Sequence, residues 1–292
     1  MTSAKSNQEI WADAYEAGYA DSVMSVTPSS VLQHAVQAEL RGLPFGSTVL
    51  IHGNGADDII PSLVAQFANV SSVVCMDFPE VIERARLAGE ASDSADAEWR
   101  SKISYEGMDA RLLGQERPEA FDCIIAINSI VAPSEAQNRQ LLESCYAATK
   151  RKGILVGLFP TIDYSLNIIK TDLRDQPWKR FLMGMTVNAQ AQTITSPSVG
   201  KQHFPNRLTL QSMIHDAGYG FPTISTLVLN DPAALRLQEQ AYNKPISVGP
   251  FKVMGLNVGP IQIADFTDVA FSPVFENLAV AQKPVNDFEP FV

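Results

Sequence analysis

The sequence has few cysteines, few basic residues relative to acidic ones, and no long apolar run. Its three cysteines, Cys75, Cys123 and Cys145, have neither zinc-site spacing nor the spacing of a redox pair, and two of them lie inside apolar runs. We therefore expect three small buried thiols in a reducing compartment and no metal site.

The charge balance argues against two classes of partner. The 292 residues include 22 Lys and Arg and 32 Asp and Glu, which gives a formal net charge of −10. Proteins that coat nucleic acids or bind anionic membranes need an excess of basic residues. No run approaches the roughly 18 apolar residues of a membrane span, and the first residues lack the apolar stretch of a signal peptide. We expect a cytoplasmic protein that binds neither nucleic acid nor a membrane.

What the chain does contain is a succession of short apolar runs separated by helical or polar segments. With 46% hydrophobic residues it has enough apolar mass for a sizeable core. The runs predict buried strands at 48–51, 72–77, 103–106, 121–128, 153–159, 224–229 and 251–258. Continuously apolar strands that alternate with helices indicate an α/β fold, a doubly wound, mostly parallel sheet whose ligand site lies at the carboxyl ends of the strands.

The same pattern divides the chain into three parts. Residues 1–45 are helical in pattern, and residues 46–260 form the α/β domain. Within that domain, residues 160–207 are irregular and polar, which predicts an insertion that covers the substrate. Residues 261–292 contain several Phe and Pro without a regular period. We expect them to form an extended tail, which could support a homodimer contact.

The turn after the first predicted strand has the clearest ligand signal. It is His52-Gly53-Asn54-Gly55, and its glycines allow the backbone to approach a ligand closely at the start of a helix. Asp77 ends the second strand about 20 residues later, where a carboxylate can accept hydrogen bonds from ribose hydroxyls. A helix cap before Pro79 is the alternative role for Asp77.

The stretch 47–159 resembles a class I S-adenosylmethionine-dependent methyltransferase of the small-molecule type. The segments that carry the resemblance are 49–55, Asp77, 107–109, 121–128 and 150–156, and Trp11, Tyr15 and Gly18 resemble the family's N-terminal lid helix. The resemblance implies a Rossmann-like methyltransferase fold. The chain departs from the family pattern at Ile51, where an acidic residue is usual, and at Asp57, where a third glycine is usual. Asp57 or Asp58 is a candidate to replace the missing carboxylate.

The resemblance also implies a role for individual residues toward the cofactor. The glycine turn and Asn128 would line the methionine part, Asp77 would hold the ribose, and Phe78 and Asp109 would face the adenine. The residues that the resemblance assigns to S-adenosylmethionine are Tyr15, Gly53, Asn54, Gly55, Asp77, Phe78, Asp109, Ala110, Asn128 and Ser129.

The acceptor side offers one candidate base. His203 lies in the irregular segment 160–207, and histidine titrates near neutral pH. A packing histidine is the alternative. His52, within the glycine turn, either touches a ligand or orients the loop.

These observations favour methyl transfer from S-adenosylmethionine to an oxygen, nitrogen or carbon atom of a small molecule in specialised biosynthesis. The alternatives are a protein of the same fold without methyl transfer, acting as a partner subunit or a cyclase-type enzyme, and an α/β-hydrolase with Ser129 as nucleophile. The β-branched residues around Ser129 argue against the hydrolase. A nicotinamide dehydrogenase would need glycine at Asp58.

Overall fold

The structure is a computed structural model of the chain. It describes residues 29–56, 58–92, 97–162, 186–196, 200–228, 246–248, 251–253, 256–258, 261–263 and 274–284. The predicted lid residue Tyr15, the departure at Asp57 and much of the predicted acceptor region lie outside the described residues. Within the described part of the chain, no helix combines the length and the hydropathy needed to cross a membrane.

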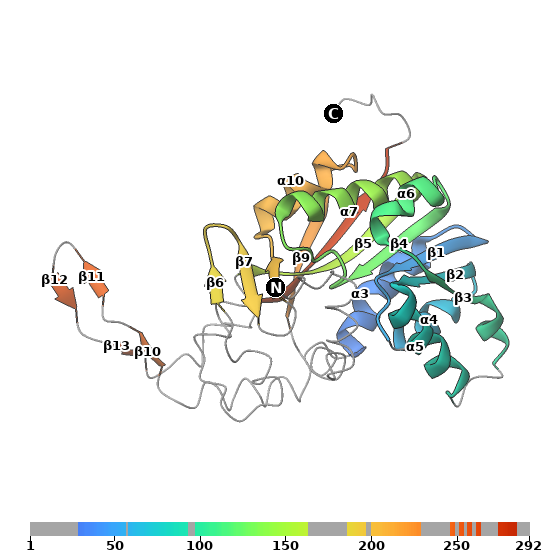
Figure 1. Cartoon of the computed structure of the whole chain (residues 1–292), viewed down its shortest axis with the longest axis horizontal. Helices are drawn as coiled ribbons and strands as arrows, with labels where there is room; N and C mark the ends of the chain where they lie inside the picture. Colours follow the sequence, from blue (N-terminus) through green and yellow to red (C-terminus); the bar gives the residue numbers. More distant parts are fainter. Residues whose placement is uncertain are drawn as a thin grey trace, which may run out of the picture.

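A seven-stranded sheet forms the centre of the fold, in the order β3-β2-β1-β4-β5-β14-β9 (Figure 1). Its strands are β1 (Ser47–His52), β2 (Val70–Asp77), β3 (Ile103–Gly107), β4 (Phe121–Ile127), β5 (Thr149–Pro160), β9 (Thr223–Val228) and β14 (Val274–Gln282). Strands β1 to β5 pair in parallel, whereas β14 is antiparallel to both β5 and β9. The prediction of a doubly wound, mostly parallel seven-stranded sheet is confirmed.

The predicted position of the last sheet strand was wrong. Residues 251–258 form two short strands, β11 (Phe251–Val253) and β12 (Leu256–Val258), that pair with each other. Strands β10 (Ile246–Val248) and β13 (Ile261–Ile263) form a second antiparallel pair. The strand that enters the main sheet is β14, in the segment that we expected to be a tail. It contains Glu276, Asn277 and two alanines, residue types that are depleted in strands, so its pattern is weak.

Two helical layers cover the sheet. One consists of α3 (Ser29–Gly42), α4 (Ile59–Ala65) and α5 (Pro79–Glu90), and the other of α6 (Leu113–Glu116), α7 (Glu135–Ala148) and α10 (Arg207–Asp216) (Figure 1). Short 3-10 helices, η1 (Glu98–Lys102) and η2 (Ala110–Leu112), flank β3.

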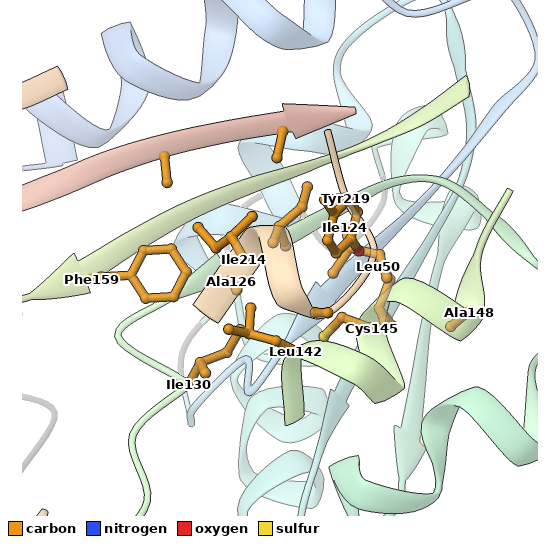
Figure 2. Close-up of a cluster of buried hydrophobic side chains, with 14 of the residues drawn as sticks. Leu50, Ile124, Ala126, Ile130, Leu142, Cys145, Ala148, Phe159, Ile214 and Tyr219 are labelled. Atoms are coloured by element: carbon orange, nitrogen blue, oxygen red, sulfur yellow. The ribbon is translucent and has the colours of Figure 1, made fainter. Parts of the chain in front are cut away.

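The alternation of side chains along the strands separates two cores. Val49 and Ile51 of β1 pack in the core under the α3–α5 layer, whereas Leu50 packs in the core under α7 and α10. Figure 2 shows the second core, in which Leu50, Leu142 and Tyr219 come from a strand, a helix and a loop. Cys75, Cys123 and Cys145 are free and buried, as predicted.

The segment predicted to be irregular contains a small antiparallel sheet. Its strands are β6 (Thr186–Asn188), β7 (Thr193–Ser196) and β8 (Gly200–His203). The backbone N–H of His203 donates to the carbonyl of Ala132 at 2.8 Å, which joins this sheet to the loop between β4 and α7. The expectation of a wholly irregular segment was wrong because three- and four-residue strands give too short a pattern to recognise.

Candidate functional site

The carboxyl ends of the parallel strands bring the predicted site segments to one edge of the sheet. The loops there are joined by backbone hydrogen bonds of 2.9 Å: Asn54 N–H donates to the carbonyl of Met76, and Met108 N–H to that of Asp77. Asn128 N–H donates in the same way to the carbonyl of Leu158. The ends of β1, β2, β3, β4 and β5 are therefore fixed relative to one another, as a ligand site requires.

The glycine turn needs both of its glycines. Gly53 and Gly55 have φ values of 59° and 75°, in the left-handed region that favours glycine. A Cβ atom on Gly53 would lie 2.3 Å from the Cβ atom of Ser129, so the turn after β1 packs directly against the end of β4. Asn128, beside Ser129, also has a positive φ of 51°.

The Asp77 carboxylate is held rigidly by two backbone donors. Its Oδ2 accepts a hydrogen bond from the N–H of Gly55 at 2.8 Å, and its Oδ1 accepts one from the N–H of Phe78 at 2.7 Å. Burial raises the pKa of Asp77 to about 6, although both hydrogen bonds lower it. Each carboxylate oxygen has a further lone pair for an outside donor, so the bond to Phe78, the cap residue of α5, and a ligand role are compatible.

Asp109 caps a turn and is paired with arginine. Its carboxylate accepts from the backbone N–H of Arg111 at 3.0 Å and also binds the Arg111 guanidinium, which lowers the pKa of Asp109. The neighbouring Ala110 accepts a hydrogen bond from the Ser144 hydroxyl at 2.9 Å. The cap role of Asp109 is thus present in the structure, and a role of Asp109 and Ala110 toward adenine stays a prediction.

Asp58 is committed to a network of its own. Its carboxylate pairs with Arg100 at 2.6 Å and accepts hydrogen bonds from the hydroxyls of Tyr105, at 2.9 Å, and Ser62, at 2.5 Å. The ion pair is largely buried, with side-chain exposures of 13% for Arg100 and 11% for Asp58. This network ties the start of α4 to η1 and β3. Asp58 is therefore not available to a ligand as a substitute for the carboxylate that is missing at position 51. The side chain of Ile51 itself is buried in the core.

His203 is joined to the site through the loop between β4 and α7. Its ring is buried, and its Nδ1 lies 3.2 Å from the amide nitrogen of Asn138. The amide oxygen of Asn138 accepts from the N–H of Ala132 at 2.6 Å, which fixes the orientation of the amide. His203 Nδ1 therefore accepts a hydrogen bond and Nε2 has the proton, 3.9 Å from the Glu135 carboxylate. Burial lowers the pKa of His203.

The structure pairs two site residues, His52 and Ser129, that the sequence analysis considered separately. His52 ends β1, is 1% exposed, and its Nδ1 lies 2.9 Å from the hydroxyl oxygen of Ser129. Burial lowers the pKa of His52 to about 4, so its ring is neutral at pH 7. The signal available was a polar residue at the end of an apolar strand, but its partner lies 77 residues away. Ser129 is not on a nucleophile elbow, because α7 begins only at Glu135.

Comparisons with known proteins identify the fold. Neither the family models nor the curated proteins gave a match. Among solved structures, the apo form of the S-adenosylmethionine-dependent methyltransferase SibL superposes with a TM-score of 0.52 at 16% identity, covering 89% of this chain and 55% of SibL. An S-adenosylmethionine-dependent methyltransferase from Methanosarcina mazei gives 0.54 at 13% identity, covering 84% and 95%.

A third match has small molecules bound. It is the 1,6-didemethyltoxoflavin-N1-methyltransferase of Burkholderia thailandensis, with 1,6-didemethyltoxoflavin and S-adenosylhomocysteine bound, at a TM-score of 0.54 and 12% identity, covering 97% and 93%. The chain spans 66% and 55% of the length of the first two structures that it matches. At these low identities the superpositions establish the fold alone. The resemblance inferred from the motifs is confirmed for the fold: the chain has the class I S-adenosylmethionine-dependent methyltransferase fold.

Proposed function

We propose that this protein binds S-adenosylmethionine at the carboxyl ends of β1 to β4 and transfers its methyl group to an oxygen, nitrogen or carbon atom of a small molecule. The observation that carries the proposal is the Asp77 carboxylate, fixed by Gly55 and Phe78 opposite two glycines of positive φ. Two carboxylate oxygens at a fixed spacing suit the two hydroxyls of a ribose.

The residues at this edge fit the cofactor in most respects. Asp77 would hold the ribose, and the turn at Gly53 would receive the methionine part. Phe78, Asp109 and Ala110 would lie at the adenine. When bound, the cofactor supplies an electrophilic methyl group on a sulfonium. The chain would align the acceptor with that group and exclude water, since a methyl displacement needs little else from the protein. Among the described residues, Ile51 departs from the family pattern, and the second departure, Asp57, lies outside them.

A small-molecule acceptor and a biosynthetic role in the cytoplasm are part of the proposal. An excess of acidic residues disfavours a nucleic-acid acceptor. The similar Burkholderia thailandensis structure has 1,6-didemethyltoxoflavin and S-adenosylhomocysteine bound. The sheet of β6, β7 and β8 meets the loop that leaves β4 at the proposed site, where an acceptor would have to enter.

The direct test is a transfer assay with methyl-labelled S-adenosylmethionine. The protein is incubated with a panel of small phenols, amines, carboxylic acids and heterocycles, and the release of S-adenosylhomocysteine is measured. Turnover with at least one acceptor class, lost in the Asp77→Ala variant, is the expected result. If the cofactor does not bind, the proposal fails.

A second candidate is a protein of this fold that binds the cofactor without transferring its methyl group, as a partner subunit or a cyclase-type enzyme. One observation favours it, the buried Ile51 in place of a carboxylate at the turn. Tight cofactor binding without methyl transfer to any acceptor class would favour this candidate over the first.

Cofactor affinity is expected to depend on pH through Asp77. The pKa of Asp77 is raised to about 6 in the free protein, so the carboxyl group is charged above this pH and takes up a proton below it. Ribose hydroxyls bind the charged form more strongly, so the affinity for S-adenosylhomocysteine should be constant above pH 7 and fall by up to about tenfold per pH unit below pH 6. Titration calorimetry from pH 8 to pH 5 measures this. An affinity that does not change over this range contradicts the assignment of Asp77.

His203 was predicted to be the base, and its contacts with Asn138 and Glu135 support a second role, that of holding the loop after β4. We expect His203→Gln to raise the KM for the acceptor several-fold and to change kcat by less than tenfold, because Nδ1 already has a protein donor. The rate is measured as a function of pH. A kcat that falls 100-fold or more, with loss of the acidic limb of the pH profile, would instead identify His203 as the base.

A further inference from the structure

The buried pair of His52 and Ser129 is the feature of the site that the proposed function has not used. His52 is 1% exposed and Ser129 is half-buried, with its Cβ atom packed against Gly53. The distance from His52 Nδ1 to Ser129 Oγ is 2.9 Å. Among the described residues, Ser129 has no other hydrogen-bond partner, and His52 Nε2 has none at all.

These contacts decide which nitrogen of His52 has the proton. The ring is neutral at pH 7, so one nitrogen is a donor and the other an acceptor. A proton on Nε2 would bury an N–H group without a partner, which folded proteins rarely allow. The proton therefore lies on Nδ1, which has a partner in Ser129 Oγ.

The direction of the Ser129 hydroxyl follows from this tautomer. If His52 Nδ1–H donates to Ser129 Oγ, the hydroxyl proton of Ser129 is free to donate elsewhere. Among the described residues this hydroxyl makes no hydrogen bond besides the one with His52, and the half-buried oxygen lies beside the glycine turn. The hydroxyl proton is thus available to a ligand at the turn.

The local charge indicates the chemistry of that ligand group. Within the described part of the turn, Ile51 is apolar and the Asp58 carboxylate is neutralised by Arg100. The Asp77 carboxylate contacts the turn at the Gly55 N–H, and the proposed function assigns it to the ribose. The Ser129 hydroxyl packs instead against Gly53, and a hydroxyl that donates there suits a carboxylate.

We propose that His52 is a positioning residue: its Nδ1–H holds Ser129 Oγ as an acceptor, so that the Ser129 hydroxyl donates to the carboxylate of the cofactor's methionine part. This inference rests on the proposed function. It accounts for the departure at Ile51, because recognition of the amino-acid end moves from the ammonium group to the carboxylate.

Three ligands test the carboxylate and the ammonium group of the cofactor separately. S-Adenosylhomocysteine has both the carboxylate and the ammonium, its decarboxylated analogue has only the ammonium, and 5′-methylthioadenosine has neither. Affinities are measured by titration calorimetry for the wild type, Ser129→Ala, His52→Phe and His52→Asn. Ser47→Ala is the matched control, because Ser47 is a buried serine at the opposite end of β1 whose hydroxyl bonds to the carbonyl of Pro44.

We expect Ser129→Ala and His52→Phe to weaken binding of S-adenosylhomocysteine by about tenfold to hundredfold, the usual value of a hydrogen bond to a charged group. Affinity for the other two ligands should change less than threefold. His52→Asn, whose amide N–H can replace Nδ1–H, should recover much of the loss, and Ser47→Ala should leave all three affinities unchanged. Equal losses for S-adenosylhomocysteine and its decarboxylated analogue would place the hydroxyl on the ammonium and overturn the proposal.

A second readout needs no ligand. Nitrogen-15 NMR of histidine-labelled protein distinguishes the two neutral tautomers, and the signal of His52 is identified among the four histidines by its absence in His52→Phe. We expect a proton on Nδ1, and a proton on Nε2 would overturn the proposal. If the wild type bound none of the three ligands, the proposed function would fail. If it bound all three and the variants did not discriminate among them, the inference about His52 would fail alone.

Discussion

Replacing Asp77 with alanine is expected to weaken the binding of S-adenosylmethionine and S-adenosylhomocysteine by about 2–4 kcal/mol, or roughly 30-fold to 1000-fold. The substitution removes a carboxylate that would accept two hydrogen bonds from the ribose, and it also frees the backbone N–H groups of Gly55 and Phe78. Titration calorimetry with each ligand measures the loss.

The chain offers a matched control for this variant in Asp122. Its carboxylate also accepts from a backbone N–H, that of Thr48 at 2.8 Å, but it lies at the other end of the parallel strands. Asp122→Ala should therefore leave the affinity unchanged. Equal losses in both variants would mean that the effect of Asp77→Ala arises from general destabilisation, and an unchanged affinity in a folded Asp77→Ala protein would remove Asp77 from the site.

The largest expected effect on stability comes from Arg100. Arg100→Met removes the cation that neutralises the buried Asp58 carboxylate, which would remain beside Tyr105 and Ser62 without its charged partner. Breaking one side of a buried ion pair costs about 3–5 kcal/mol in the free energy of unfolding. Urea denaturation followed by circular dichroism measures the change.

Two further variants show whether the buried charge is the cause. The double variant Asp58→Asn/Arg100→Met should recover much of the lost stability, because no unpaired charge is then buried. Arg86→Met, which removes an exposed arginine paired with Glu83 and Glu90, should produce no measurable change. If Arg100→Met is as stable as the wild type, the network does not hold the start of α4 as we describe.

The sequence is sufficient to predict the parts of the fold with strong local patterns. The runs that became β1, β2, β4 and β5 are apolar and rich in β-branched residues, and both faces of these strands are covered. Strand β14 could not be recognised because its alanines, Ala279 and Ala281, have little intrinsic preference for strands and are buried by packing between β5 and β9.

The site, too, has residues whose role the sequence predicts and residues whose pairing only the structure shows. The glycine turn and Asp77 are predictable because their spacing along the chain is that of a strand, a turn and a helix. The pair of His52 and Ser129 and the pair of Asp58 and Arg100 are not, because their members are 77 and 42 residues apart and meet only in the folded sheet. Asp109 could be assigned either a cap or a ligand role from sequence, and only the structure shows its pairing with Arg111.

The most direct test of the central claim is calorimetric titration of the purified wild-type protein with S-adenosylhomocysteine at pH 7.5. The account predicts one micromolar site per chain that is weakened in Asp77→Ala and retained in Asp122→Ala. A protein that is folded by circular dichroism and gives no heat of binding would contradict the account, because the edge formed by Gly53, Gly55 and Asp77 would then not be a cofactor site.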